Sequence, residues 1–188
     1  VLAVLARGAE GPQDAGEDLL ALVVAVLGDH LAAGGLEPLD DRVGANPFKF
    51  GMIGATDSHT GMSSAEEDNF HGKMALDSTP DTRGEDILPG TPGWDMGAAG
   101  LAGVWATENT RDSLFEAMKR KEVYATTGPR IELRFFGGYG FSEADASAGD
   151  VAGAGYTKGV PMGSDLAKAP EGKAPSFLIR AVKDPKHA

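Results

Sequence analysis

Short apolar runs of strand length recur along the middle and the end of the chain. They cover residues 48–55 ("FKFGMIGA"), 100–106 ("GLAGVWA"), 123–128 ("VYATTG"), 131–136 ("IELRFF") and 176–182 ("SFLIRAV"). Runs of this length, bounded by Gly, Pro and polar residues, are typical of β-strands. After the first run, Ser63 and Glu66 form a capping-box pair that predicts a short helix. Strands that alternate with helices favour an α/β fold.

Residues 111–122 ("RDSLFEAMKRKE") carry the clearest helical pattern. Their large apolar side chains share one helix face, and Glu116 stands four residues before Arg120, the favourable order for an ion pair. An acid in the first turn and bases in the last turn complement the helix dipole. We expect Trp105, just before this segment, to be a packing residue.

The N-terminal part, one middle segment and the C-terminal part of the chain carry weaker patterns. Leu19 to Leu31 predict a helix whose apolar residues occupy every face, and Asp77 to Gly93 predict a long surface loop. Beyond residue 137, glycine-rich loops and one last strand predict a separate β-rich region. We therefore divide the chain into a partly helical N-terminal segment (1–43), an α/β part (44–136), and a loop-rich and β-rich extension (137–188).

Composition narrows the class of protein. The 188 residues suffice for one domain, or for one domain and part of another. The net charge of -11 argues against general binding to nucleic acid, because phosphate contacts need clustered Lys and Arg. The longest apolar run, Leu19 to Leu27, is about half of the ~20 residues that a membrane helix needs, and no basic segment precedes it as in a signal peptide. The absence of cysteine excludes disulfide and thiolate chemistry.

A carboxylate and an imidazole stand two residues apart in "GATDSHTG" (54–61), at the end of the first apolar run. Residues two apart on an extended chain point to the same side, so Asp57 and His59 could bind one divalent ion or two adjacent ions. The alternative is a polar turn, since an Asp that follows a strand often forms an Asx-turn. Two ligands are also fewer than the roughly three to four that proteins supply to zinc.

Three other groups are weaker candidates. The acidic cluster Glu66, Glu67 and Asp68 could contact a cation, or could simply begin a solvated helix. Glu108, in the polar turn "TENT", is a candidate ligand or base, and the alternative is that it caps the next helix. Arg130, which follows a Gly-Pro pair at a strand end, could bind an anionic substrate, or could be a surface arginine at a turn.

Several segments together resemble a known family. They are "NPFKFGMIGATDSHTG", "AEEDNFHGK", "GLAGVWATENTRDSLFEAMKRKEVYATTGPRI" and "RFFGGYGF". They are similar to the C-terminal part of a large uncharacterised bacterial family, a domain of unknown function related to the PHP (polymerase and histidinol phosphatase) superfamily of metal-dependent hydrolases. The resemblance covers roughly residues 44–188. The block "ATENTR…YATTGPR" is its specific part, whereas "TDSH" alone is not specific.

The resemblance implies a distorted β/α barrel with a multinuclear metal site at the carboxyl ends of its strands. Asp57 and His59 fall on the closing D-x-H motif of that site, which implies that they bind divalent Zn, Mn or Fe. Relatives in the superfamily mostly hydrolyse phosphate esters, so a small anionic substrate is implied, with Arg130 as a candidate contact. This chain departs from the pattern, since it contains no H-x-H motif and holds only the last strands of the barrel.

Our leading hypothesis is a fragment of a phosphoesterase-like metal-dependent hydrolase that has an incomplete metal site and is inactive alone. A start at Val1, with the first methionine at Met52, fits a fragment. An amidohydrolase-type enzyme that cleaves C–N bonds and a non-catalytic α/β structural or binding module both stay open. Exposed interior strands of a half-barrel favour a homo-oligomer. We expect no nucleic-acid and no membrane partner.

Overall fold

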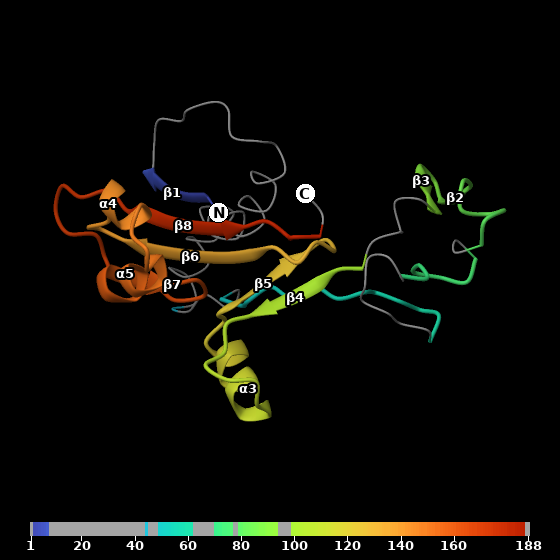
Figure 1. The fold of residues 1–188 in the computed structure, drawn as a ribbon, viewed down its shortest axis with the longest axis horizontal. Coiled ribbons are helices and arrows are strands. Elements are labelled where there is room, and N and C mark those ends of the chain that lie inside the picture. The colour runs from blue at the N-terminus through green and yellow to red at the C-terminus, as the bar shows by residue number, and fades with distance from the viewer. Residues whose placement is uncertain are drawn as a thin grey trace.

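A four-stranded antiparallel sheet forms the centre of the structure (Figure 1). The computed structural model describes residues 2–7, 44, 49–61, 70–76, 79–93 and 99–186. The order of strands in the sheet is β1 (Leu2–Arg7), β8 (Ser176–Val182), β6 (Glu132–Gly138) and β7 (Gly159–Pro161). The central pair, β6 and β8, is in unbroken register from Glu132 opposite Val182 to Gly138 opposite Ser176.

Smaller elements surround this sheet. Two further antiparallel pairs are β2 (Asp86–Leu88) with β3 (Thr91–Pro92), and β4 (Leu101–Val104) with β5 (Val123–Thr126). The helices are α3 (Arg111–Lys119), α4 (Glu143–Ala146) and α5 (Val151–Lys158). In Figure 1, α4 and α5 lie at one end of the large sheet, α3 projects from the β4–β5 pair, and β2 and β3 lie well apart from the sheet.

Successive side chains of β6 serve two separate cores. Leu133 and Phe135 lie on one face of the strand and Phe136 lies on the other, as the two-residue period of a strand requires. The first face packs against the β4–β5 pair and the second packs against α4 and α5. The first core contains Tyr124, Leu133, Phe135, Met162, Ile179 and Ala181, and the second contains Phe136, Phe141, Val151 and Leu178. β6 therefore contributes to both cores and connects the β4–β5 pair on one side with α4 and α5 on the other.

Aromatic side chains close the part of the β6 edge that β7 does not reach. The carbonyl oxygens of Ile131 and Leu133 accept hydrogen bonds from the Tyr124 hydroxyl (2.9 Å) and from the Trp105 indole N–H (2.7 Å). A strand edge left without partners would expose unpaired backbone groups. Trp105 also packs against the first core, so the expectation that it is a packing residue is confirmed.

The structure confirms the mixed α/β class and most of the predicted elements. Strands occur within four of the predicted runs, namely 100–106, 123–128, 131–136 and 176–182, although β6 continues to Gly138. The predicted loop at 77–93 holds the short β2–β3 pair in its described part. The predicted helices at 19–31 and after Ser63 lie outside the described residues.

The helix predicted at 111–122 ends earlier, at Lys119. Thr110 begins it by accepting a hydrogen bond from the Ser113 N–H, and Arg120 is the C-cap. Lys121 then adopts a left-handed conformation with φ 62°, and the Glu122 N–H bonds to the Ala117 carbonyl. This is a Schellman ending, which stops the helix and turns the chain. The predicted pair between Glu116 and Arg120 is wrong, because Arg120 binds Glu122 instead.

The arrangement of strands and helices expected of a β/α barrel is not found in the described residues. β4, α3 and β5 follow one another in sequence, yet β4 and β5 pair antiparallel, with Val104 opposite Val123. The Trp105 N–H donates to the Glu122 carbonyl at 3.0 Å and closes the connection at the strand ends. The helix therefore lies beyond the ends of the strands and does not run back along them. Every strand pair of the described chain is antiparallel, and these pairs form no barrel.

The strand predicted at 48–55 is also wrong for its described part, 49–55, which has no regular secondary structure. This segment lies beside β4 so closely that a side chain at Gly54 would collide with the Leu101 carbonyl. Phe50 and Ile53 are 59% and 61% exposed. The apolar pattern that predicted a strand therefore belongs to an irregular segment with exposed apolar side chains.

The C-terminal extension contains more structure than the sequence predicted. Besides β8 it holds α4, α5 and β7. The α5 helix was missed because its sequence, "VAGAGYTK", contains two glycines, which are poor helix formers. Gly155 is needed there because any larger side chain would overlap the Phe136 ring. Among the residues that the structure describes, no helix is both long and apolar enough to span a bilayer.

Gly103→Ala should destabilise the fold. Gly103 stands opposite Tyr124 in the β4–β5 pair, and an added Cβ would overlap the Tyr124 ring. The ring cannot move freely, because its hydroxyl is bonded to the Ile131 carbonyl. We expect a loss of about 1–3 kcal/mol in the free energy of unfolding, measured by urea denaturation. Gly149→Ala, where the added Cβ meets nothing within 4 Å, is the matched control. Equal stability of the two variants would contradict this packing.

Asp145 should stabilise the fold down to a low pH. The Lys158 amine, at 2.6 Å, and the hydroxyl and N–H of Ser142 lower the pKa of Asp145 from 3.8 to about 2. Since the folded pKa lies below the unfolded one, the stabilisation is complete above 3.8 and is lost as the pH falls through about 2. Carboxyl NMR titration measures this pKa. Lys158→Met should raise it, whereas Lys168→Met should not.

Candidate metal centre

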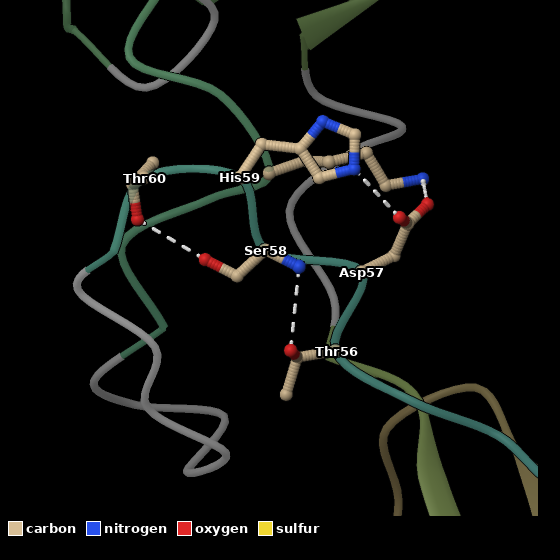
Figure 2. A network of polar contacts seen from close by, with 6 residues as sticks. Thr56, Asp57, Ser58, His59 and Thr60 are labelled. Carbon is tan, nitrogen blue, oxygen red and sulfur yellow. Dashed lines mark hydrogen bonds and ion pairs between the residues drawn. The ribbon is translucent and has the colours of Figure 1, made fainter.

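Asp57 and His59 meet in the irregular segment that passes β4. Figure 2 shows the carboxylate and the ring facing each other, with 2.9 Å between Asp57 Oδ1 and His59 Nε2. The second carboxylate oxygen, Oδ2, lies 2.7 Å from Lys73 Nζ. The Asp57 and His59 side chains are each 57% exposed. The structure therefore brings the two predicted ligands together at an accessible position.

A turn, rather than an extended strand, brings the two side chains together. Asp57 has a φ of 52°, the left-handed region that Asp tolerates better than most residues. The Thr56 hydroxyl accepts a hydrogen bond from the Ser58 N–H at 3.3 Å, and the Ser58 and Thr60 hydroxyls are 3.1 Å apart (Figure 2). The His59 N–H donates to the Lys73 carbonyl at 2.6 Å. Residues 56–60 therefore form a polar turn, the alternative that the sequence had left open.

The charge of Lys73 dominates the electrostatics of this pair. The Lys73 amine, and after it the His59 ring, hold the pKa of Asp57 below its ordinary value. The contact with Lys73 thus favours the ionised form of Asp57, the form that acts as an anionic ligand. Lys73 was missed by the sequence analysis, because nothing in a separation of sixteen residues indicates that it returns to Asp57.

The measured separation of the pair is that of a hydrogen bond, slightly shorter than the separation of two ligands on one ion. Ligand atoms that lie about 2.1 Å from a metal, about 90–110° apart, are about 3.0–3.4 Å from each other. The 2.9 Å between Asp57 Oδ1 and His59 Nε2 is close to that range. Within the described ranges, however, no three or more His, Asp or Glu side chains gather as a metal-binding group. Asp57 and His59 are therefore two candidate ligands, which a hydrogen bond joins in this structure.

Of the remaining predicted site residues, Arg130 and Glu108 lie within the described ranges, and neither is bonded to Asp57 or His59 there. Arg130 is exposed, and its backbone N–H donates to Asp184 Oδ2 at 2.7 Å. No hydrogen bond or ion pair links Arg130 to Asp57 or His59 in the part of the chain that is described. Glu108 is exposed and does not cap α3, since Thr110 takes that role. The acidic cluster at 66–68 lies outside the described residues.

Comparison with known proteins shows the family to which the chain belongs. A family model described as "Protein of unknown function (DUF3604)" matches residues 31–188. The chain belongs to this family. Neither the curated proteins nor the solved structures gave a match. The DUF3604 match begins ahead of residue 44, where the sequence resemblance was expected to begin, and confirms a domain of unknown function.

The candidate metal centre lies within the DUF3604 region. Asp57, His59 and Lys73 all fall inside residues 31–188, as do α3 and strands β2 to β8. Only β1, among the described elements, lies outside it. The turn that joins the pair is therefore part of the family domain.

Lys73→Met should raise the pKa of Asp57. Removal of the amine takes away the largest cause of the lowered pKa, which should then return toward the ordinary value of an aspartate. Because the folded pKa lies below the unfolded one, ionised Asp57 stabilises the fold above the unfolded pKa, and this contribution is lost as the pH falls through the lowered value. Carboxyl NMR titration checks the shift. Lys119→Met, which removes an amine that lies near Glu116, is the control, and equal Asp57 titration in both variants would refute the assignment.

Proposed function

We propose that this chain is part of a metal-dependent hydrolase of the phosphoesterase type, in which Asp57 and His59 supply two ligands to a divalent metal. The observation that carries the proposal is the 2.9 Å approach of the Asp57 carboxylate to the His59 imidazole, at a position open to solvent. A hard oxygen and a borderline nitrogen are the donors that Zn, Mn and Fe accept together.

The roles of the residues follow from their charges. Asp57, held ionised by Lys73, would offer an anionic oxygen, and His59 would offer a neutral ring nitrogen. Lys73 would either remain on the second carboxylate oxygen and orient the ligand, or give up that position to an ion. When bound, the metal would lower the pKa of water and polarise a substrate oxygen. The other ligands of a multinuclear site would come from residues outside the described ranges.

The relation to the PHP superfamily and its barrel is part of the same proposal. Exposed apolar side chains support it, because the described residues leave several of them without cover. They are Phe50, Met52, Ile53, Phe115 and Met118. In the proposed intact protein, further chain or a second copy would cover some of these side chains, each of which is at least 42% exposed. Contacts between the subunits of a homo-oligomer would also bury these apolar side chains.

A non-catalytic binding or structural module is the alternative that the geometry itself raises. The ion pair between Asp57 and Lys73, at 2.7 Å, already compensates the carboxylate without a metal. On that alternative, the turn is a structural one and His59 only completes its hydrogen bonds. The metal content of the purified protein distinguishes this non-catalytic module from the metal-dependent hydrolase.

The protein purified as the longest natural reading frame that contains this chain should hold stoichiometric Zn, Mn or Fe by elemental analysis. Asp57→Asn combined with His59→Ala should abolish that content, because both donors are removed. Asp112→Asn combined with His71→Ala removes one exposed acid and one exposed histidine elsewhere, and should leave it unchanged. Metal retained by the Asp57/His59 variant, with a native circular-dichroism spectrum, would overturn the assignment.

A panel of substrates then distinguishes phosphomonoester hydrolysis from amide hydrolysis. The metal-loaded protein should hydrolyse some members of a phosphomonoester panel, and the Asp57/His59 variant should hydrolyse none. Turnover of amides, with none of phosphomonoesters, would instead establish an amidohydrolase-type enzyme. Arg130→Gln tests the expected contact to an anionic substrate, for which a raised KM with little change in kcat is expected.

A further inference from the structure

A charged hollow lies where the β4–β5 pair meets the large sheet and α5. It measures about 340 Å³, and the residues that matter among its lining are Trp105, Arg120, Glu122, Arg134 and Tyr156. This volume is at the lower end of the range for small-molecule sites, about 300–1,000 Å³. The hollow shares no lining residue with the Asp57–His59 pair.

The buried carboxylate of Glu122 organises the hollow. The Schellman ending of α3 turns the chain inward at this residue, whose exposed fraction is only 6%. Its Oε1 accepts a hydrogen bond from Arg120 Nε at 2.8 Å, and its Oε2 accepts one from the Tyr156 hydroxyl at 2.5 Å. Both carboxylate oxygens are thus engaged. Burial, and after it the bond to Glu122, raises the pKa of Tyr156, so this hydroxyl stays protonated and keeps donating.

Arg134 reaches the same hollow from β6. Its guanidinium carbon lies 3.4 Å from the centre of the Trp105 ring, and its Nη1 donates to the Tyr156 hydroxyl at 2.9 Å. Stacking on the ring immobilises the guanidinium and leaves the N–H groups along its edge available for other partners. Trp105 is itself fixed by its bond to the Leu133 carbonyl.

The charges of the hollow do not balance. Two guanidinium groups face one carboxylate, and no carboxylate within the described residues forms an ion pair with Arg134. Each guanidinium carries about five N–H groups, of which only one per arginine has a hydrogen-bond partner in the described chain. Arg134 also stands directly opposite Arg180 on β8, an arrangement of like charges that is unfavourable.

We propose that this hollow binds the phosphate group of a small molecule between Arg120 and Arg134, with the Glu122–Tyr156 pair as its fixed floor. The surplus of positive charge and of N–H donors in the hollow favours an anionic ligand. Two guanidinium forks on separate elements offer more donors than a single carboxylate can accept, whereas a phosphate presents three acceptor oxygens and up to two negative charges. The inference rests on the hollow alone and does not depend on metal binding at Asp57 and His59.

Trp105 provides the probe, since it lies in the hollow and the chain has one other tryptophan, Trp94. In a Trp94→Phe background, titration with inorganic phosphate at constant ionic strength should change the Trp105 fluorescence saturably at millimolar concentrations. Acetate and chloride should give a much weaker change. A linear response to phosphate, or an equal affinity for acetate, would overturn the proposal.

Conservative variants locate the site. Arg120→Lys and Arg134→Lys keep the charge but lose the planar fork, so each should weaken phosphate binding about tenfold or more. Arg111→Lys, at an exposed position of α3 that does not line the hollow, should bind as the parent does. Equal affinity in all three variants would refute the site. As a check that needs no folded variant, the Nε–H NMR signals of Arg120 and Arg134 in the unmodified protein should shift with phosphate, and the absence of any shift would also refute it.

Discussion

The hydrogen bonds that close the free edge of β6 hold the rest of the structure in place. β7 covers only the last residues of that strand, from Phe136 to Gly138. Beyond them, Trp105 and Tyr124 donate to the Leu133 and Ile131 carbonyls and thereby attach the β4–β5 pair to the large sheet. Side chains donate these hydrogen bonds, because the β4–β5 pair and the four-stranded sheet do not join into one sheet. The first core is buried under this connection.

The same attachment determines where charged groups can gather. With Trp105 at the edge of β6, its ring supports the Arg134 guanidinium, and the Glu122 carboxylate comes to lie next to Tyr156 of α5. Charges that are buried in this way are stable only when they are paired and hydrogen-bonded, which Glu122 is. The Asp57–His59 pair is a different kind of site, since it is exposed and Lys73 binds its carboxylate. The domain thus carries two chemically distinct polar centres.

Local sequence signals predicted those elements that local interactions stabilise. The α3 helix has a Thr cap, an acid in its first turn and a lysine in its last, and β8 coincides with the predicted run at 176–182. Asp57 and His59 were predicted as possible ligands of one ion on an extended chain. Their side chains lie 2.9 Å apart, but a turn rather than an extended chain joins them. The α5 helix was missed for the opposite reason, since its glycines serve close packing on Phe136 and lower its own helix propensity.

The sequence by itself therefore determined the mixed α/β class, the main strands and helix, and the Asp57–His59 pair. Only the tertiary structure decided that β4 and β5 pair antiparallel, that residues 49–55 form no strand, and that Lys73 compensates Asp57. The tertiary structure also brought together the residues of the hollow, which come from the two segments that join α3 to β4 and β5, from β6 and from α5. The physical reason is separation along the chain: strand direction and charge pairing depend on contacts between segments tens of residues apart, which no local pattern encodes.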